Sequence, residues 1–234
     1  MANSEFDFVV VGGGSAGCVL AHRLSADPAN RVLVLEAGSR DRWWDVLVEM
    51  PAAAIYAVGH ASHDWRYDSV PEPQLDDRTI RHARGRGLGG SSAINGMVYQ
   101  RGHAANYDEW ATRPGMAHWS NAHCLPYFAK LENCTDPDAG PSRGRHGPQD
   151  LRRGPATGPL WDAFFAAAEQ AGHPRTVDTN EHQEGFAPFD RVVRRGRRVS
   201  AAKAYLASVR RRANLDVRCN VLVTKVLFEG RRAV

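Results

Sequence analysis

The chain has 234 residues, of which 43% are hydrophobic and 24% charged, the composition of an ordinary globular protein long enough to bury a sizeable core. It shows neither an apolar run of about 18 residues nor a basic-then-apolar start, so we expect a cytoplasmic protein without a membrane-spanning or signal segment. Its net charge of +4 comes without a basic face carrying interleaved aromatic residues, which disfavours a nucleic-acid partner.

The four cysteines give no metal or disulfide signal. They are scattered and form no C-x-x-C pair, which argues against a zinc site and against a secreted disulfide framework. Cys18, inside a predicted helix, is expected to be a small packing residue. We therefore predict no metal centre.

Residues 6–36 predict a strand, a glycine-rich turn, a helix and a second strand. Apolar residues 6–11 indicate a buried strand, and residues 32–35 indicate a second one that ends at Glu36. Between them, Gly12, Gly14 and Gly17 have the G-x-G-x-x-G spacing, and apolar residues then recur at helical intervals. This pattern is typical of a dinucleotide-binding unit.

The chemistry of a dinucleotide explains these residue types. Gly12 permits the tight turn, Gly14 lets the backbone approach a pyrophosphate, and Gly17 lets the helix pack against the sheet. The helix N-terminus favours phosphate, and Glu36 lies near the spacing of about 20 residues expected for a ribose-binding acid. Its negative charge disfavours NADP, but this stretch alone leaves NAD and FAD both open.

Residues 39–84 form a long excursion without sustained periodicity. We expect short helices there, for example around residues 51–58, and a role as a lid or cofactor wall. A second glycine-rich stretch follows at residues 84–110, where Ser91 or Ser92 is expected to cap a helix beginning at residues 93–95. By composition, an anion site and a flexible hinge are equally supported for this loop.

The remaining elements alternate between helices, a connector and strands. Ser120 is predicted to cap a helix over residues 121–130, and Ser200 a helix to about residue 211. The other expected elements are a connecting loop over 136–159, a helix over 160–171, and strands over 186–193, 215–217 and 221–228. Gly230 indicates a turn and residues 233–234 the start of a strand, which we interpret as truncation.

Together these motifs resemble the glucose–methanol–choline (GMC) oxidoreductase family. The resemblance rests first on GGGSAG with Glu36-Ala37-Gly38 and on the second glycine-rich loop with Ile94-Asn95. Essentially the whole chain fits, and the resemblance is strongest to choline-dehydrogenase-like and related alcohol dehydrogenases. Further matches are His63-Asp64-Trp65, Tyr107-Asp108-Glu109-Trp110, Arg198 and Ser200-Ala201-Ala202 with Ala204-Tyr205-Leu206, and Asn214-Leu215.

The resemblance implies FAD as the cofactor. Glu36 would hold the adenosine ribose, Asn95 would lie beside the flavin ring, and the backbone of Val223 would hold the adenine. Ile94 stands where some family members attach the flavin through a histidine, so we expect non-covalent FAD. The implied cofactor-binding residues are Gly12, Gly14, Ser15, Ala16, Gly17, Glu36, Ala37, Trp65, Gly87, Gly89, Gly90, Ser91, Asn95, Gly96, Met97, Val98 and Val223.

The implied reaction oxidises a primary alcohol, choline or similar, to an aldehyde, with a histidine accepting the hydroxyl proton and a hydride passing to flavin N5. In the family that histidine lies in the C-terminal third, so we expect no catalytic residue in this chain and no activity of this chain alone. The resemblance does not identify the electron acceptor. A peripheral association with a membrane through that acceptor is therefore an open alternative. The alternatives are a non-catalytic dinucleotide-binding module and an NAD-dependent dehydrogenase, which leaves the second glycine-rich loop unexplained.

The expected fold class is α/β, a Rossmann-like FAD-binding domain with the beginning of an α+β substrate domain, truncated. We expect residues 1–135 to form the first part of the FAD-binding domain, including the excursion at 39–84. Residues 136–197 would begin the substrate domain, and residues 198–234 would return to the FAD-binding domain.

Overall fold

The structure, a computed structural model, describes residues 5–233 and divides into two compact units. Of the described residues, the first unit comprises 5–96 with 196–233, and the second comprises Met97–Arg195. The chain thus leaves the first unit near residue 97, against the expected 136, and returns near residue 196, against the expected 198. The three expected domain segments stay a prediction.

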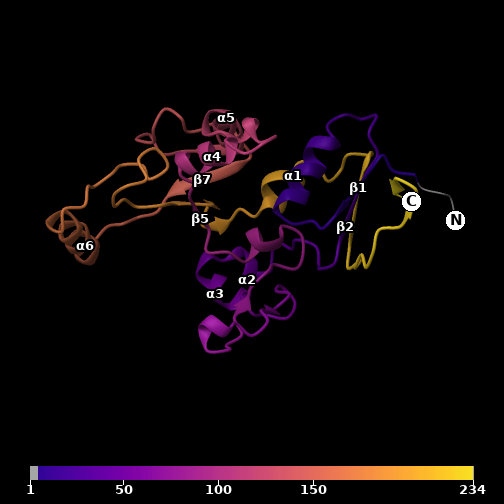
Figure 1. Ribbon diagram of the computed structural model, residues 1–234, viewed down its shortest axis with the longest axis horizontal. Helices are drawn as coiled ribbons and strands as arrows, with labels where there is room; N and C mark the ends of the chain where they lie inside the picture. Colours follow the sequence, from indigo (N-terminus) through magenta and orange to yellow (C-terminus); the bar gives the residue numbers. More distant parts are fainter. Residues whose placement is uncertain (1–4, 234) are drawn as a thin grey trace. The chain divides into compact units, whose positions relative to one another are not determined.

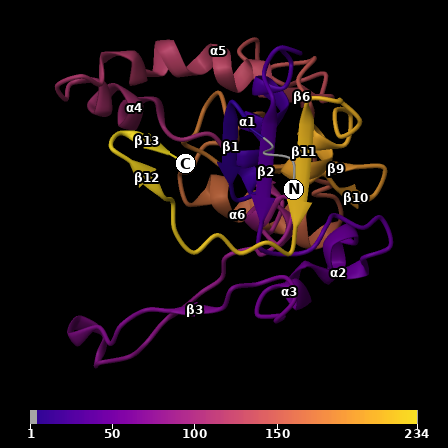
Figure 2. The same cartoon turned by 90° about the vertical axis from the view of Figure 1, so that its right-hand side faces the viewer.

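The first unit is built on a parallel sheet (Figure 1). Strand β1 (Phe8–Val11) pairs in parallel with β2 (Val32–Glu36), which pairs in parallel with β11 (Leu215–Cys219), so the three run side by side (Figure 2). Helix α1 (Ser15–Leu24) connects β1 to β2 and packs on both. The expected strand–turn–helix–strand unit and the strand at 215–217 are confirmed. The expectation that the first strand is buried is wrong, because β1 lies at an edge of this sheet and only its Val10 is buried.

The core of this unit joins the sheet to two helices. Val32 and Val34 from β2 are fully buried, as are Cys18 and Ala21 from α1. They form one cluster with the buried side chains of Tyr205, Leu206 and Val209. Burial raises the pKa of the Cys18 thiol to about 12, and its Sγ donates to the carbonyl of Gly13 at 3.1 Å. Cys18 is the packing residue that its pattern predicted.

The excursion contains short elements only. They are α2 (Val46–Glu49), η1 (Pro51–Ala53), α3 (Ala54–Ala57), β3 (Tyr67–Asp68), η2 (Pro73–Leu75) and β4 (Arg81–His82); η3 (Gly90–Ala93) follows in the second glycine-rich stretch. The short helices expected around residues 51–58 are confirmed. Strands β3 and β4 pair as an antiparallel ribbon. The unit also contains β10 (Arg197–Arg198), η5 (Ala202–Leu206), β12 (Phe228–Glu229) and β13 (Arg232–Ala233).

Three sequence predictions in the first unit are wrong. Neither Ser91 nor Ser92 caps a helix at 93–95, because both lie inside the 3-10 turn η3, which follows Gly89 at φ +93°. The helix after Ser200 is short, with η5 ending at Leu206, although the Ser200 hydroxyl does accept from the Lys203 N–H at 3.4 Å. Residues 221–227 are extended without strand pairing within the described chain, so only Phe228–Glu229 becomes a strand. The expected turn at Gly230 is confirmed by the β12–β13 pairing, but Val234 lies outside the described residues.

The second unit combines a four-stranded sheet with helices. The sheet has the order β5-β8-β7-β6, with β6 and β7 parallel and the other pairs antiparallel. Its elements are β5 (Val98–Tyr99), α4 (Ala104–Ala111), η4 (Ala117–Trp119), α5 (Asn121–Leu131), β6 (Glu132–Cys134), β7 (Gln149–Arg153), α6 (Pro159–Gln170), β8 (Asp190–Arg191) and β9 (Val193–Arg194).

The predicted helices of the second unit are confirmed and its loop is corrected. Ser120 caps α5 by accepting from the His123 N–H, and α6 matches the helix expected over 160–171. The connector expected at 136–159 instead contains β7, whose Leu151 is fully buried. The polar residues of β7 hid it from sequence analysis, because ion pairs take the place of an apolar face. The strand expected over 186–193 is limited to β8 and the start of β9.

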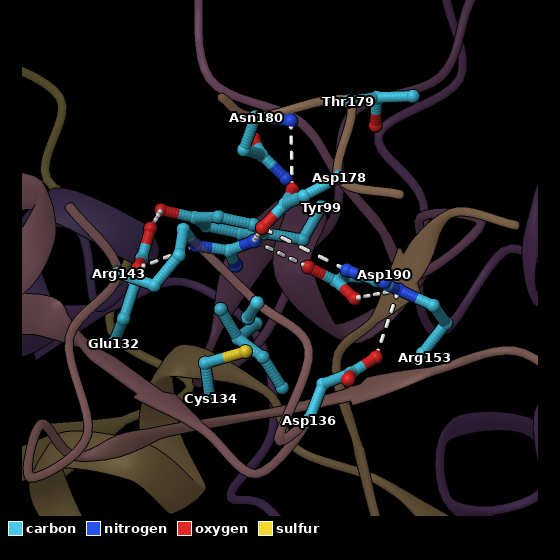
Figure 3. A network of polar contacts seen from close by, with 12 residues as sticks. Tyr99, Glu132, Cys134, Asp136, Arg143, Arg153, Asp178, Thr179, Asn180 and Asp190 are labelled. Carbon is cyan, nitrogen blue, oxygen red and sulfur yellow. Dashed lines mark hydrogen bonds and ion pairs between the residues drawn. The ribbon is translucent and has the colours of Figure 1, made fainter. Parts of the chain in front are cut away.

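Arg153 of β7 joins a buried network of ion pairs in the second unit through Asp178 and Asp190 (Figure 3). Arg143 donates to Glu132 at 2.9 Å and to Asp178 at 2.8 Å, and its Nη1 lies 2.8 Å from Asp190. Arg101 donates to both carboxylate oxygens of Glu132, at 2.7 and 2.8 Å. Except for Arg153, every one of these side chains is almost fully buried, so removing one partner would leave an uncompensated buried charge.

The network is expected to make the second unit sensitive to acid. Burial acts to raise the pKa of Glu132, but hydrogen bonds from Arg101, Tyr99 and Arg143 outweigh burial and lower that pKa. The pKa of Asp178 is also lowered, because hydrogen bonds from the Asn180 N–H and from Arg143 outweigh the effect of burial. Carboxyls with a depressed folded pKa stabilise the fold above their unfolded pKa of about 4, and this stabilisation is lost as pH falls through the folded value.

The measurement is amide hydrogen exchange of β6 and β7, corrected for intrinsic rates, between neutral and acid pH. Protection should decline below about pH 4. Glu132→Gln should already lower protection at neutral pH and flatten its decline in acid. Equal protection of the native chain across the whole range would contradict this role of the network.

Candidate cofactor-binding site

The turn between β1 and α1 is shaped for close approach. Gly12 has φ +94°, a backbone conformation that favours glycine, and a Cβ added there or at Gly14 would meet almost nothing. Gly14 precedes the first residue of α1 and gives it no side-chain cap. The first-turn N–H groups, which have no partners within the helix, therefore face a space that a ligand can enter.

Gly17 has a different role, which is to let α1 lie against the turn. A Cβ on Gly17 would stand 2.0 Å from the carbonyl oxygen of Gly12. No side chain can be accommodated at that distance without moving the backbone. The tight turn predicted at Gly12 and the close packing predicted at Gly17 agree with the local geometry, and the pyrophosphate contact of Gly14 stays a prediction.

The second glycine-rich loop lies directly against the first. The Gly89 N–H donates to the Gly13 carbonyl at 2.8 Å, and a Cβ on Gly90 would stand 2.8 Å from Gly14 Cα. Gly87, Gly89 and Gly90 all have positive φ angles, so the loop reaches this contact through conformations that favour glycine. The loop is therefore a built part of the site, and the hinge interpretation is not supported.

Glu36 ties the two loops together. Its side chain is buried, and its Oε2 accepts from the Gly13 N–H at 2.7 Å. Its Oε1 accepts from the N–H groups of Gly38 at 2.8 Å and Gly87 at 2.9 Å. Both carboxylate oxygens therefore bind backbone of the first turn, the end of β2 and the second loop.

A cavity of about 370 Å³ opens where these segments meet. Seven of the residues predicted from the sequence line it, namely Gly12, Gly14, Glu36, Ala37, Trp65, Gly90 and Val223. Trp65 stacks on Tyr67 with ring centroids 5.9 Å apart, and the Arg86 guanidinium lies 5.2 Å from its indole. Trp65 and Val223 come from distant segments, and the fold brings both to the glycine turn.

The other predicted residues lie outside the lining of this cavity. Ser15 and Ala16 are exposed at the start of α1, and the Ser91 hydroxyl accepts from the Gly85 N–H. Gly87, Gly89, Asn95 and Gly96 lie along the second loop or at its exit. Met97 and Val98 belong to the second unit, where the buried Met97 has φ +62° and accepts from the Val192 N–H.

Arg198 is a residue of the site that sequence analysis did not assign. It is buried, and its guanidinium donates to the carbonyls of Ser92 and Asn95 at 3.3 and 2.7 Å and to Asn95 Oδ1 at 2.7 Å. Burial lowers the pKa of Arg198 to about 10. The Ser92 hydroxyl also accepts from the Ala201 N–H. Arg198 is thus a positioning residue that fixes the exit of the second loop.

The comparisons with known proteins agree with this geometry. The sequence profile of GMC oxidoreductase matches residues 6–234. The chain belongs to the GMC oxidoreductase family. Among curated relatives of this GMC chain, an oxygen-dependent choline dehydrogenase from Staphylococcus xylosus is 53% identical over 230 residues, covering 97% of this chain and 41% of the relative. The chain therefore spans less than half the length of the curated relatives that it matches.

Solved structures show the same fold for this GMC oxidoreductase chain. Pyridoxine 4-oxidase from Mesorbium loti superposes with a TM-score of 0.90 at 36% identity, over 98% of this chain and 45% of that protein. An FAD-dependent oxidoreductase from Chaetomium thermophilum superposes with a TM-score of 0.87 at 31% identity, over 98% and 41%. The predicted fold class, an FAD-binding domain of the GMC type that covers part of its longer relatives, is confirmed.

The residues of this GMC chain fit FAD, the cofactor of the family. The glycine turn presents a bare backbone and a helix N-terminus to an anion, and an aromatic side chain stands at the same cavity. Among residues 5–233, no cluster of three or more His, Cys, Asp or Glu side chains could hold a metal ion. Nor does any helix in this range have the length and apolar character to cross a membrane.

Proposed function

We propose that this chain is the FAD-holding N-terminal part of an oxidoreductase that converts a primary alcohol, choline or a similar one, to its aldehyde. The observation that supports it most is the contact between two glycine-rich loops tied by Glu36, with a cavity beside them. The Staphylococcus xylosus relative is named a choline dehydrogenase, which supports choline as the substrate. Choline is a primary alcohol, so its dehydrogenation gives an aldehyde.

The cofactor-binding residues of the proposal fall into three groups. Gly12, Gly14, Ser15, Ala16 and Gly17 offer backbone and the α1 dipole to the pyrophosphate. Glu36, Ala37, Trp65 and Val223 hold the adenosine half. The residues assigned to the flavin half are Gly87, Gly89, Gly90, Ser91, Asn95, Gly96, Met97 and Val98.

The protein's own residues orient and shield rather than react. When bound, FAD supplies the hydride acceptor at N5. Arg198 holds the backbone of Ser92 and Asn95 in place, so the loop assigned to the flavin keeps a fixed shape. We further propose that the base for the substrate hydroxyl comes from sequence that the longer relatives have in addition, and that this chain alone is inactive.

The flavin is proposed to be bound non-covalently. Ile94 is an aliphatic residue with 3% of its surface exposed, and its side chain offers no nucleophile for a covalent bond. The attachment can therefore be tested with the same sample that tests cofactor binding.

The deciding experiment is the visible spectrum of the purified chain with FAD, before and after acid precipitation. We expect flavin absorbance in the native sample that moves to the supernatant with acid. Gly14→Leu is the matched control, because a Cβ at this position would meet only the Gly90 Cα, at 3.9 Å, which is an ordinary contact distance, while the larger side chain would stand beside the proposed pyrophosphate site. It should fold and stay colourless. A folded native chain without flavin contradicts the proposal, and flavin retained in the pellet contradicts non-covalent binding.

A further inference from the structure

A second and larger cleft, of about 770 Å³, lies elsewhere in the first unit. It is formed by the segment 40–44 after β2, by residues at and beyond η5, and by residues 216–220 of β11 and its end. It shares no lining residue with the cavity at the glycine turn. Its volume lies in the range of about 300–1,000 Å³ that is typical of small-molecule sites.

Three arginines give the cleft an excess of positive charge. Among residues 5–233, no carboxylate lies within salt-bridge distance of Arg40, Arg42 or Arg210, although all three line the cleft. Arg40 donates only to a carbonyl, that of Val217, at 3.3 Å. Lining cations that do have acidic partners are Arg218, paired with Asp216, and Lys203, paired with Glu49.

Two adjacent tryptophans stand in the same cleft and are exposed. Trp43 keeps 70% of its surface in contact with solvent and Trp44 keeps 59%. Their rings meet edge to face at 5.7 Å, and the Arg42 guanidinium lies 5.8 Å from the Trp44 ring. Exposed aromatic rings beside an arginine offer a ring face and a cation together, and this combination suits a planar anionic group.

A smaller recess adjoins the cleft and has both charged and leucine side chains in its lining. A recess of about 260 Å³ shares Arg40, Asp41 and Arg210 with the outer part and adds Leu88, Leu206 and Leu215. Leu206 and Leu215 are core residues, so the floor is fixed by the packing of the sheet. A ring can therefore be buried here while its charged group stays near the arginines.

Asp41 is an acidic residue in the lining of this cleft, and its negative charge acts against the binding of an anion. Burial raises the pKa of its carboxyl, while Lys203 and Arg210 oppose that effect. Its buried Oδ1 has no hydrogen-bond partner among the described residues. An oxygen in this state can accept a hydroxyl or amine donor of a ligand, and the neighbouring cations offset its charge.

We propose that this cleft binds a small aromatic anion, a planar ring carrying a carboxylate or phosphate. The ring packs against Trp43 or Trp44 and the leucine floor, and the anionic group is held by Arg40, Arg42 and Arg210. The site is separate from the dinucleotide cavity, and nothing in the proposed alcohol oxidation requires it. It therefore adds a second ligand to this protein.

The test is calorimetric titration of the chain with naphthoate, in excess FAD so that the dinucleotide cavity is filled. We expect binding to the native chain, and binding about tenfold weaker to Arg42→Gln and to Arg210→Gln, the loss typical of one charge-assisted contact. Trp43→Leu should also weaken it several-fold. Arg211→Gln is the matched control, since Arg211 is exposed, adjacent to Arg210 and absent from the lining, and it should bind like the native chain.

Two neutral or non-aromatic probes separate the parts of the proposal. Naphthylmethanol, which lacks the charge, and cyclohexanecarboxylate, which lacks the aromatic ring, should both bind more weakly than naphthoate. The proposal would be overturned if naphthoate did not bind, if the neutral probe bound equally well, or if Arg211→Gln lost as much affinity as Arg210→Gln. It would also be overturned if the chain bound to anionic vesicles but not to naphthoate. Gly14→Leu should bind naphthoate normally, so a failure of FAD binding and a failure of this site can be told apart.

Discussion

Gly17→Ala is expected to abolish FAD binding and to destabilise the first unit by about 3 kcal/mol or more, the upper range for an overpacked site. The added Cβ would stand 2.0 Å from the Gly12 carbonyl oxygen and 3.1 Å from its carbonyl carbon. Both are backbone atoms, so a rotamer change cannot relieve the overlap. Either α1 moves away from the sheet or the glycine turn changes shape, and each alternative destroys the cradle.

Gly96→Ala is the control for this substitution. Gly96 has no heavy atom within 4 Å of an added Cβ, and its φ is not in the region that favours glycine. We expect a change in the free energy of unfolding within about 0.5 kcal/mol. The measurements are denaturant unfolding of both variants and flavin absorbance of Gly17→Ala, because Gly96 is itself assigned to the flavin half and serves as a control for stability alone. If Gly17→Ala retained flavin with native stability, the close packing of α1 on the turn would be wrong.

Glu36→Gln is expected to lower both stability and FAD affinity, although it changes little in volume. A glutamine side chain keeps one acceptor oxygen and replaces the other with an NH₂ group. That group would face either the Gly13 N–H or the pair from Gly38 and Gly87, all of which now donate to Glu36. Leaving a buried donor unsatisfied costs about 1–3 kcal/mol, and separation of the loops would reduce FAD affinity at least tenfold.

Asp7→Asn provides the comparison, because Asp7 is also a carboxylate that accepts from backbone, with its Oδ2 2.6 Å from the Arg31 nitrogen, but in an exposed position. The Asp7→Asn substitution should lower the free energy of unfolding by less than about 1 kcal/mol and leave FAD binding unchanged. Unfolding must be measured without FAD. If Glu36→Gln weakened FAD binding while the stability of the FAD-free chain stayed native, Glu36 would act on the ligand alone and not as the tie between the loops.

The contrast between Gly17 and Ser92 shows how far local pattern can be trusted. Gly17 was assigned its packing role from a spacing within one strand–turn–helix unit, where all the partners are neighbours in sequence. Ser92 was assigned a helix cap by the same kind of local rule, but its hydroxyl donates to the Gly89 carbonyl and accepts from Ala201, more than a hundred residues away. A residue whose partner is distant in sequence gives no local signal of its role.

Strand β7 makes the same point for secondary structure. Its sequence, QDLRR, carries one apolar residue and lies in a stretch rich in Gly, Pro, Arg and Asp. It becomes a strand because β6 and β8 pair with it and because Asp136 and Asp190 pair with its Arg153. Periodicity of apolar residues cannot reveal a strand that is held by charge.

By itself, the sequence determined the β1–α1–β2 unit, the existence of strand β11, the helices α5 and α6 and the resemblance to GMC oxidoreductases, because each depends on short-range spacing or on a continuous motif. Only the tertiary structure decided that Glu36 binds three backbone N–H groups, that Arg198 fixes the second loop, and that Trp65 and Val223 reach one cavity. It also decided which arginines lack acidic partners. These features depend on groups brought together from distant parts of the chain, and burial sets their energies only after the fold has formed.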